Sequence, residues 1–170
     1  MTSFIPQPGD FGLTQIDGFT GRLVQFGQWL NGDGLHNWQH AFIYVGGGEI
    51  IEAAPGGARL ASLAQYEGDD TILWSSPGIT LTSKERDGVV DAAYHYLGTP
   101  YSVATYLSLA TARLGIRPAW LRELVADTDA MICSQYVDQC FQDAGFHLFV
   151  DGRIPGDVTP GDLARRVGGA

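Results

Sequence analysis

Apolar residues in the first half of the chain occur in short runs separated by turn residues, the pattern of β-strands. AFIYV and EIIEAA flank Gly46-Gly47-Gly48, and glycine supplies the positive φ angles that a hairpin turn needs. Both runs are apolar on both faces, which places this hairpin centrally in a sheet. The predicted strands cover residues 11–16, 41–45, 49–54 and 71–75.

The spacing of apolar residues changes to a helical period after about residue 80. Thr82 and Glu85 have the spacing of a capping box at a helix start, and Gly145 follows a helical pattern as a C-terminal cap would. The predicted helices cover about residues 19–30, 83–97, 102–114, 118–125 and 132–144. Strands followed by helices indicate an α+β fold with a central antiparallel sheet packed against helices.

Length and composition indicate one globular domain over residues 1–170, because 45% of the residues are hydrophobic and only 17% are charged. The formal charge of −9 repels phosphate backbones, so nucleic acid is not expected as a partner. No apolar stretch has the roughly 18 residues of a membrane span. The first ten residues lack the basic and apolar regions of a secretory signal, so we expect a cytoplasmic protein.

The predicted hairpin brings two ionisable residues together. With the three glycines as its loop, Val45 pairs with Glu49 and Phe42 with Glu52, so that His40 and Glu52 become diagonal neighbours on one face. Separately, His40 could be a core histidine bonded to a backbone carbonyl, and Glu52 could reach solvent at a strand end. Together they predict a pair, because a buried carboxylate is costly without a partner and an imidazole supplies one. Such a pair commonly activates a nucleophile.

Cys133 is the candidate nucleophile, because it lies at the first turn of a predicted helix, where unpaired N–H groups and the helix dipole stabilise a thiolate. Cys140 lies on nearly the same stripe and is interpreted as a small buried hydrophobe. About 10 Å of helical rise separates the two Cα atoms, which excludes a disulfide between them.

Other chemistries have weaker support in the sequence. There is no GxSxG elbow, phosphate loop, HExxH or CxxC motif. The four histidines, His36, His40, His95 and His147, lack zinc-ligand spacing. A metal site formed by His40, Glu52 and Cys133 would have only three ligands of mixed hardness, so we expect neither a metal nor another cofactor.

Several motifs together resemble a known family. LGTPY at residues 97–101 and the segment ICSQYVDQCFQDAG are similar to those of NlpC-like cysteine peptidases, which have a papain-like fold. The order here is histidine, glutamate, cysteine, which resembles the circularly permuted branch of YiiX-like proteins and lecithin:retinol acyltransferase-like enzymes. The Pro8-Gly9-Asp10 turn and the HAFIYVGGGEIIEA hairpin also fit the YiiX-like pattern.

The resemblance implies roles for individual residues. Cys133 corresponds to the nucleophile, His40 to the general base and Glu52 to the residue that orients the base, while Tyr101 corresponds to a tyrosine that lines the site and contacts the substrate or the oxyanion. This chain lacks the glycine-rich stretch that often follows the PY motif in peptidoglycan-cleaving relatives. It has in its place a predicted helical insertion over about residues 102–131.

Three functions follow from these residues. The first is a thiol hydrolase that cleaves an amide bond, with a peptidoglycan peptide of a bacterium or phage as the substrate that the resemblance implies and delivery by a virion or by lysis. The second is a lipid-directed acyltransferase or esterase with the same triad, favoured by the apolar stripe in the predicted insertion unless that stripe packs on the core. The third is a catalytically silent structural or interaction module, for instance of a virion.

Overall fold

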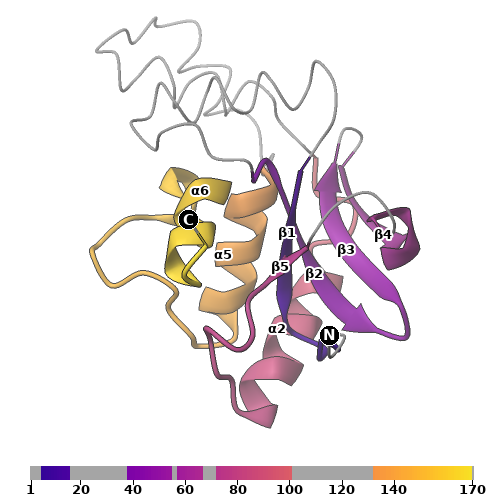
Figure 1. Ribbon diagram of the computed structural model, residues 1–170, viewed down its shortest axis with the longest axis horizontal. Coiled ribbons are helices and arrows are strands. Elements are labelled where there is room, and N and C mark those ends of the chain that lie inside the picture. Colours follow the sequence, from indigo (N-terminus) through magenta and orange to yellow (C-terminus); the bar gives the residue numbers. More distant parts are fainter. Residues whose placement is uncertain (1–4, 16–37, 55–56, 67–71, 101–131, 170) are drawn as a thin grey trace, which may run out of the picture.

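The computed structural model describes residues 5–15, 38–54, 57–66, 72–100 and 132–169. These residues form a mixed α+β structure with a five-stranded antiparallel sheet and three α-helices (Figure 1). The strands are β1 (Phe11–Thr14), β2 (His40–Gly46), β3 (Glu49–Ala54), β4 (Gly57–Ser62) and β5 (Leu73–Trp74). The helices are α2 (Ser83–His95), α5 (Cys133–Asp143) and α6 (Pro160–Arg166), with 3₁₀ turns η1 (Leu63–Tyr66) and η2 (Pro155–Asp157).

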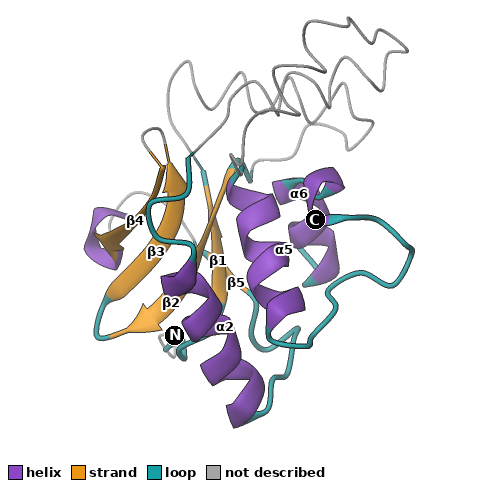
Figure 2. Ribbon diagram, turned by 180° about the vertical axis from the view of Figure 1, so that it is seen from behind, coloured by secondary structure: helices purple, strands orange, loops and turns teal. Residues whose placement is uncertain are grey.

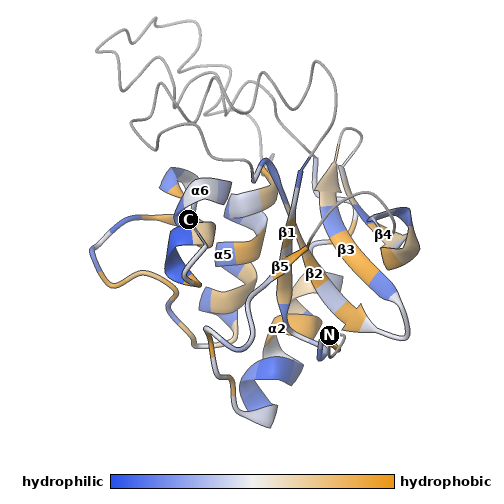
Figure 3. Cartoon of the chain, viewed as in Figure 1, coloured by the Kyte–Doolittle hydropathy of each residue, from blue (hydrophilic) through white to orange (hydrophobic). Residues whose placement is uncertain are grey.

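The strand order β4-β3-β2-β1-β5 puts the predicted hairpin inside the sheet, as its two apolar faces indicated. Figure 3 shows that the central strands are largely hydrophobic, whereas the first turns of α2 are hydrophilic. Alternation along β2 sends Ala41 and Ile43 into the main core and Phe42 into a second, smaller apolar cluster on the opposite face. The sheet therefore separates two cores.

Helices α2 and α5 cover the main-core face of the sheet (Figure 2). The capping box of Thr82 and Glu85 is present as predicted. Helix α2 ends at His95 rather than near Leu97, because the next residues turn back to the sheet: the N–H of Gly98 donates to the carbonyl of Ala58, at 2.8 Å. Leu97 is consequently exposed and does not extend the apolar stripe of the helix.

The turn before β1 is fixed to the rest of the fold by Asp10, which is 1% exposed. Its carboxylate accepts hydrogen bonds from Ser75 and Ser76 in the loop after β5 and from Arg86 on α2, at 3.3, 2.7 and 3.0 Å. The neighbouring Gly9 has a φ of +87°, and a Cβ atom there would lie only 3.0 Å from the Arg86 backbone. The Pro8-Gly9-Asp10 motif thus has a structural role, joining three separate segments.

One strand and one α-helix were not predicted, and two predicted strands are shorter in the structure. Strand β4 lacks clear alternation because Gly57 and Ala58 open it. Helix α6 was not predicted, although Thr159 and Asp162 form a capping box there. Strands β1 and β5 have four and two residues. The predicted helices at residues 19–30, 102–114 and 118–125 lie outside the described residues. Among the described residues, no helix combines the length and apolarity that a membrane crossing requires.

Candidate active site

The central hairpin places His40 and Glu52 side by side. Phe42 pairs with Glu52 as predicted, and His40 Nε2 lies 2.7 Å from Glu52 Oε2. The predicted pairing of Val45 with Glu49 is wrong, because Glu49 pairs with Gly46 and the register shifts at Val45. The extra residue of this bulge shifts the pairing of β2 with β3 by one position, which is the same shift that a three-residue loop would produce. The histidine and the glutamate therefore still share a face.

Glu52 is fully buried and is surrounded by hydrogen-bond donors. Its Oε1 atom accepts from Arg59 Nε and Nη2, at 2.9 and 2.7 Å, and from Gln65 Nε2 at 3.3 Å. Its Oε2 atom accepts from the Tyr66 hydroxyl at 2.5 Å as well as from His40. Burial alone would raise the pKa of Glu52, but these bonds, with His40 first, lower it to about 2. The carboxylate is therefore ionised at neutral pH.

His40 links this carboxylate to a sulfur atom. The residue is 7% exposed and lies between the other two site residues: its Nε2 is hydrogen-bonded to Glu52, and the side chain of Cys133 interacts with its ring. Because Nε2 donates to Glu52, Nδ1 is the ring nitrogen left for the sulfur, and a neutral His40 keeps its proton on Nε2. Burial by itself lowers the pKa of His40, but the bonds to Cys133 and Glu52 outweigh it and raise the pKa to about 9.

Cys133 is the first residue of α5, so its backbone N–H lies in the helical turn that has no intrahelical acceptor. The preceding residue, Ile132, makes no side-chain capping bond, which leaves the positive end of the helix dipole directed at this position. Ser134 fixes the start of the helix, since its buried hydroxyl donates to the Val158 carbonyl at 2.7 Å. The three predicted site residues thus lie together, with His40 hydrogen-bonded to Glu52 on one side and interacting with Cys133 on the other.

Cys140 lies two turns further along α5 and is completely buried in the main core. Burial raises the pKa of its thiol. Both cysteines are free thiols, and the helix separates them as expected. Cys140 is positioned as a small apolar residue that packs between the helix and the sheet.

Three residues that hold Glu52 were not identified from the sequence. Arg59 lies directly opposite Glu52 on β4, and Gln65 and Tyr66 belong to η1. Once β4 is recognised as a strand, its pairing with β3 predicts that this arginine faces the buried glutamate. Gln65 and Tyr66 lie in a 3₁₀ turn after the end of a strand, where neither the strand period nor the α-helix period applies. No sequence pattern therefore indicates where their side chains point.

Tyr101, the residue that the family resemblance assigns to the substrate or the oxyanion, lies outside the described residues, as does the predicted insertion at residues 102–131. Within the described ranges, no group of three or more His, Cys, Asp or Glu side chains has the arrangement of a metal site.

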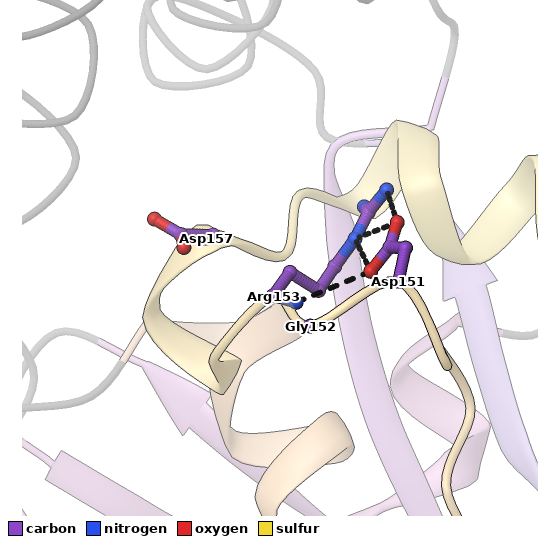
Figure 4. A pocket seen from close by; sticks show the side chains of 4 residues that line it. All are labelled: Asp151, Gly152, Arg153 and Asp157. Carbon is purple, nitrogen blue, oxygen red and sulfur yellow. Dashed lines mark hydrogen bonds and ion pairs between the residues drawn. The ribbon is translucent and has the colours of Figure 1, made fainter.

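A hollow of about 480 Å³ lies elsewhere, in the loop between α5 and α6. It is lined by Asp151, Gly152, Arg153 and Asp157 (Figure 4). The guanidinium of Arg153 is bound by Asp151 at 2.6 Å and by Asp162 at 2.8 Å, and Figure 4 shows Asp157 standing apart from this pair. These ion pairs fix the loop to α6, so we assign the hollow a structural origin.

Scans of the chain against protein-family models and against curated protein sequences find no match.

Proposed function

We propose that the protein is a thiol hydrolase that cleaves an amide bond of a peptide or isopeptide with Cys133 as nucleophile, His40 as general base and acid, and Glu52 as the residue that orients the base. The observation that carries the proposal is the position of His40, which is hydrogen-bonded to a buried, ionised carboxylate and interacts with the Cys133 side chain. The bond to Glu52 gives the imidazole the tautomer that a base for Cys133 needs, with Nδ1 free to accept the thiol proton.

In the proposed reaction His40, whose raised pKa keeps it protonated at neutral pH, already holds the thiol proton, and the Cys133 sulfur forms a bond to the carbonyl carbon of the substrate. The carbonyl π electrons move to oxygen, where the backbone N–H of Cys133 at the helix start is a fitting donor. The C–N bond then breaks, and the imidazolium gives its proton to the departing amine. A thioester to Cys133 remains, and His40 deprotonates the water that hydrolyses it. Glu52 stays ionised throughout and stabilises the imidazolium.

The same proposal includes the fold family and the substrate class. A circularly permuted papain-like fold would account for the order of the hairpin before the cysteine helix, and for the packing of α5 on the sheet that carries the histidine. In that setting Tyr101 would line the substrate site, and a peptidoglycan peptide, reached by virion delivery or lysis, is the substrate that the family resemblance favours. A lipid acyl substrate is the alternative that the same triad could process.

The experiment incubates purified muropeptides, and separately phospholipid vesicles, with the wild-type protein and with Cys133→Ala, and follows the products by mass spectrometry. We expect new muropeptide fragments with the wild type and none with Cys133→Ala. Cys140→Ala is the matched control, because it removes the same atom from the same helix away from His40. Turnover of phospholipid but not of muropeptides would contradict the amide hydrolase and support the lipid-directed acyltransferase or esterase. No turnover of either substrate would favour the silent module.

A further inference from the structure

The Tyr66 hydroxyl contacts Glu52 at the oxygen that His40 also uses. It donates to Oε2 at 2.5 Å, and His40 Nε2 lies 2.7 Å from the same atom. The other oxygen, Oε1, accepts only from Arg59 and Gln65 among the described residues. Two strong donors therefore share one acceptor atom, and the hydrogen bond of each donor to Oε2 weakens the hydrogen bond of the other.

The ring of Tyr66 is fixed by the smaller core. It is stacked on Phe42, with ring centroids 5.3 Å apart and an angle of 8° between the planes. It also lies 5.9 Å from the His40 ring, at 41°. Phe42 is itself fully buried and packs against Trp74 in a T-shaped arrangement, with ring centroids 5.7 Å apart. The hydroxyl is thus held by a rigid aromatic stack, which gives the hydrogen bond to Glu52 a fixed direction.

We propose that Tyr66 is a positioning residue that acts through Glu52: it fixes the plane of the carboxylate and limits how tightly that carboxylate holds the proton of His40. The inference rests on the proposed thiol hydrolase function, and it adds a residue that no motif in the sequence indicates. Tyr66 itself need not touch the substrate for this role.

The chemistry gives a reason for such a limit. His40 must lose its proton to the departing amine and must then deprotonate water, so an imidazolium held too tightly would slow both steps. Among the described residues, the charged and titratable groups around the His40–Glu52 pair are Cys133 from α5, Arg59 from β4 and Tyr66 from η1. Tyr66 is the one among them whose bond competes with His40 for the same oxygen.

The test follows the titration of the His40 imidazole by NMR in protein labelled with ¹³C-histidine, with His40 assigned from its absence in His40→Gln. We expect the midpoint, about 9 in the wild type, to rise by about half to one pH unit in Tyr66→Phe, because Glu52 then has His40 as the only described donor to Oε2. Replacing Tyr66 with 3-fluorotyrosine makes the hydroxyl a stronger donor, so the midpoint should fall.

Tyr96→Phe is the matched control, because it also removes a hydroxyl that donates to a carboxylate, at 2.7 Å from Asp143 Oδ2 at the far end of α5. It should leave the His40 midpoint unchanged. On a turned-over substrate, Tyr66→Phe should lower kcat about tenfold with little change in KM.

An unchanged His40 midpoint in both Tyr66 proteins, even with a loss of thermal stability, would overturn the inference and leave Tyr66 with a packing role only. If Tyr66→Phe does not fold, the 3-fluorotyrosine protein keeps the ring and the hydroxyl and decides the question alone. The titration needs no substrate. A protein that hydrolyses nothing but shows the two opposite shifts would contradict the proposed function and retain the link between Tyr66 and His40.

Discussion

Replacing Glu52 with glutamine removes one negative charge and keeps the shape of the side chain. The four described residues that bond to this carboxylate all do so as donors. An amide offers one acceptor oxygen and one donor nitrogen, so in either orientation its NH₂ group meets donors. With the oxygen towards Arg59, the nitrogen faces His40 and Tyr66. His40 can then accept only in the tautomer with its proton on Nδ1, so the tautomer that serves as a base for Cys133 becomes less populated.

The magnitude follows from two effects. A buried donor left without an acceptor costs about 1–3 kcal/mol. In addition, the pKa of His40 is about 9 in the folded protein and about 6.5 when unfolded. A raised pKa stabilises the fold fully below about pH 6.5, and the contribution disappears as the pH rises through about 9. The shift in the pKa of His40 corresponds to about 3 kcal/mol of stability. The part of it that comes from Cys133 remains in Glu52→Gln. We therefore expect Glu52→Gln to lose about 2–4 kcal/mol at pH 6 and clearly less at pH 10.

The assay is urea denaturation followed by tryptophan fluorescence at pH 6 and pH 10. Glu85→Gln is the matched control, because Glu85 is an exposed capping residue whose pKa is lowered by its bonds to Thr82, and it stays ionised at both pH values. Its loss of stability should be the same at the two pH values. An equal loss for Glu52→Gln at pH 6 and pH 10 would refute the reasoning, since it would mean that the Glu52 charge is not coupled to the proton on His40.

Three further predictions concern the site and its support. His40→Ala should lower kcat by about 10²–10⁴-fold, and Glu52→Gln should lower it less, because an orienting group is easier to dispense with than the base; rate measurements in the reverse order would remove Glu52 from its proposed role. Iodoacetamide at neutral pH should alkylate Cys133 well before Cys140, whose thiol pKa is raised by burial; equal, slow labelling of both in peptide mass spectra would favour the silent module. Asp10→Ala should cost about 3–5 kcal/mol, because it leaves Arg86 without its buried partner; a melting temperature within about 2 °C of the wild type would contradict the anchoring role of Asp10.

The relation between His40 and Glu52 was predictable because side chains on paired strands obey simple arithmetic. Once the Gly46-Gly47-Gly48 turn is recognised, the count to Phe42 and Glu52 determines which side chains share a face. The prediction did not depend on the details of the turn, since the bulge at Val45 and an odd loop give the same offset. Cys133 was predictable for a similar local reason, as a thiol at the start of an amphipathic helix.

The residues that hold Glu52 could not be found in this way. Strand β4 begins with Gly57 and Ala58, so its sequence carries too weak a period to reveal that Arg59 faces the carboxylate. Tyr66 reaches Glu52 from a 3₁₀ turn, and its direction depends on stacking against Phe42 two strands away. Contacts of this kind arise from tertiary packing, which local propensity does not encode. Helix α6, in contrast, had a readable start in Thr159, Pro160 and Asp162.

The bulge at Val45 has an evolutionary and engineering consequence. Because it compensates for the two-residue turn at Gly47 and Gly48, adding or deleting one residue in β2 between the bulge and His40 would rotate the imidazole to the other side of the sheet, while Glu52 stayed where it is. Length changes are harmless in most surface hairpins. In this hairpin, engineered and natural length changes are restricted to insertions at the tip that keep the β2–β3 pairing register.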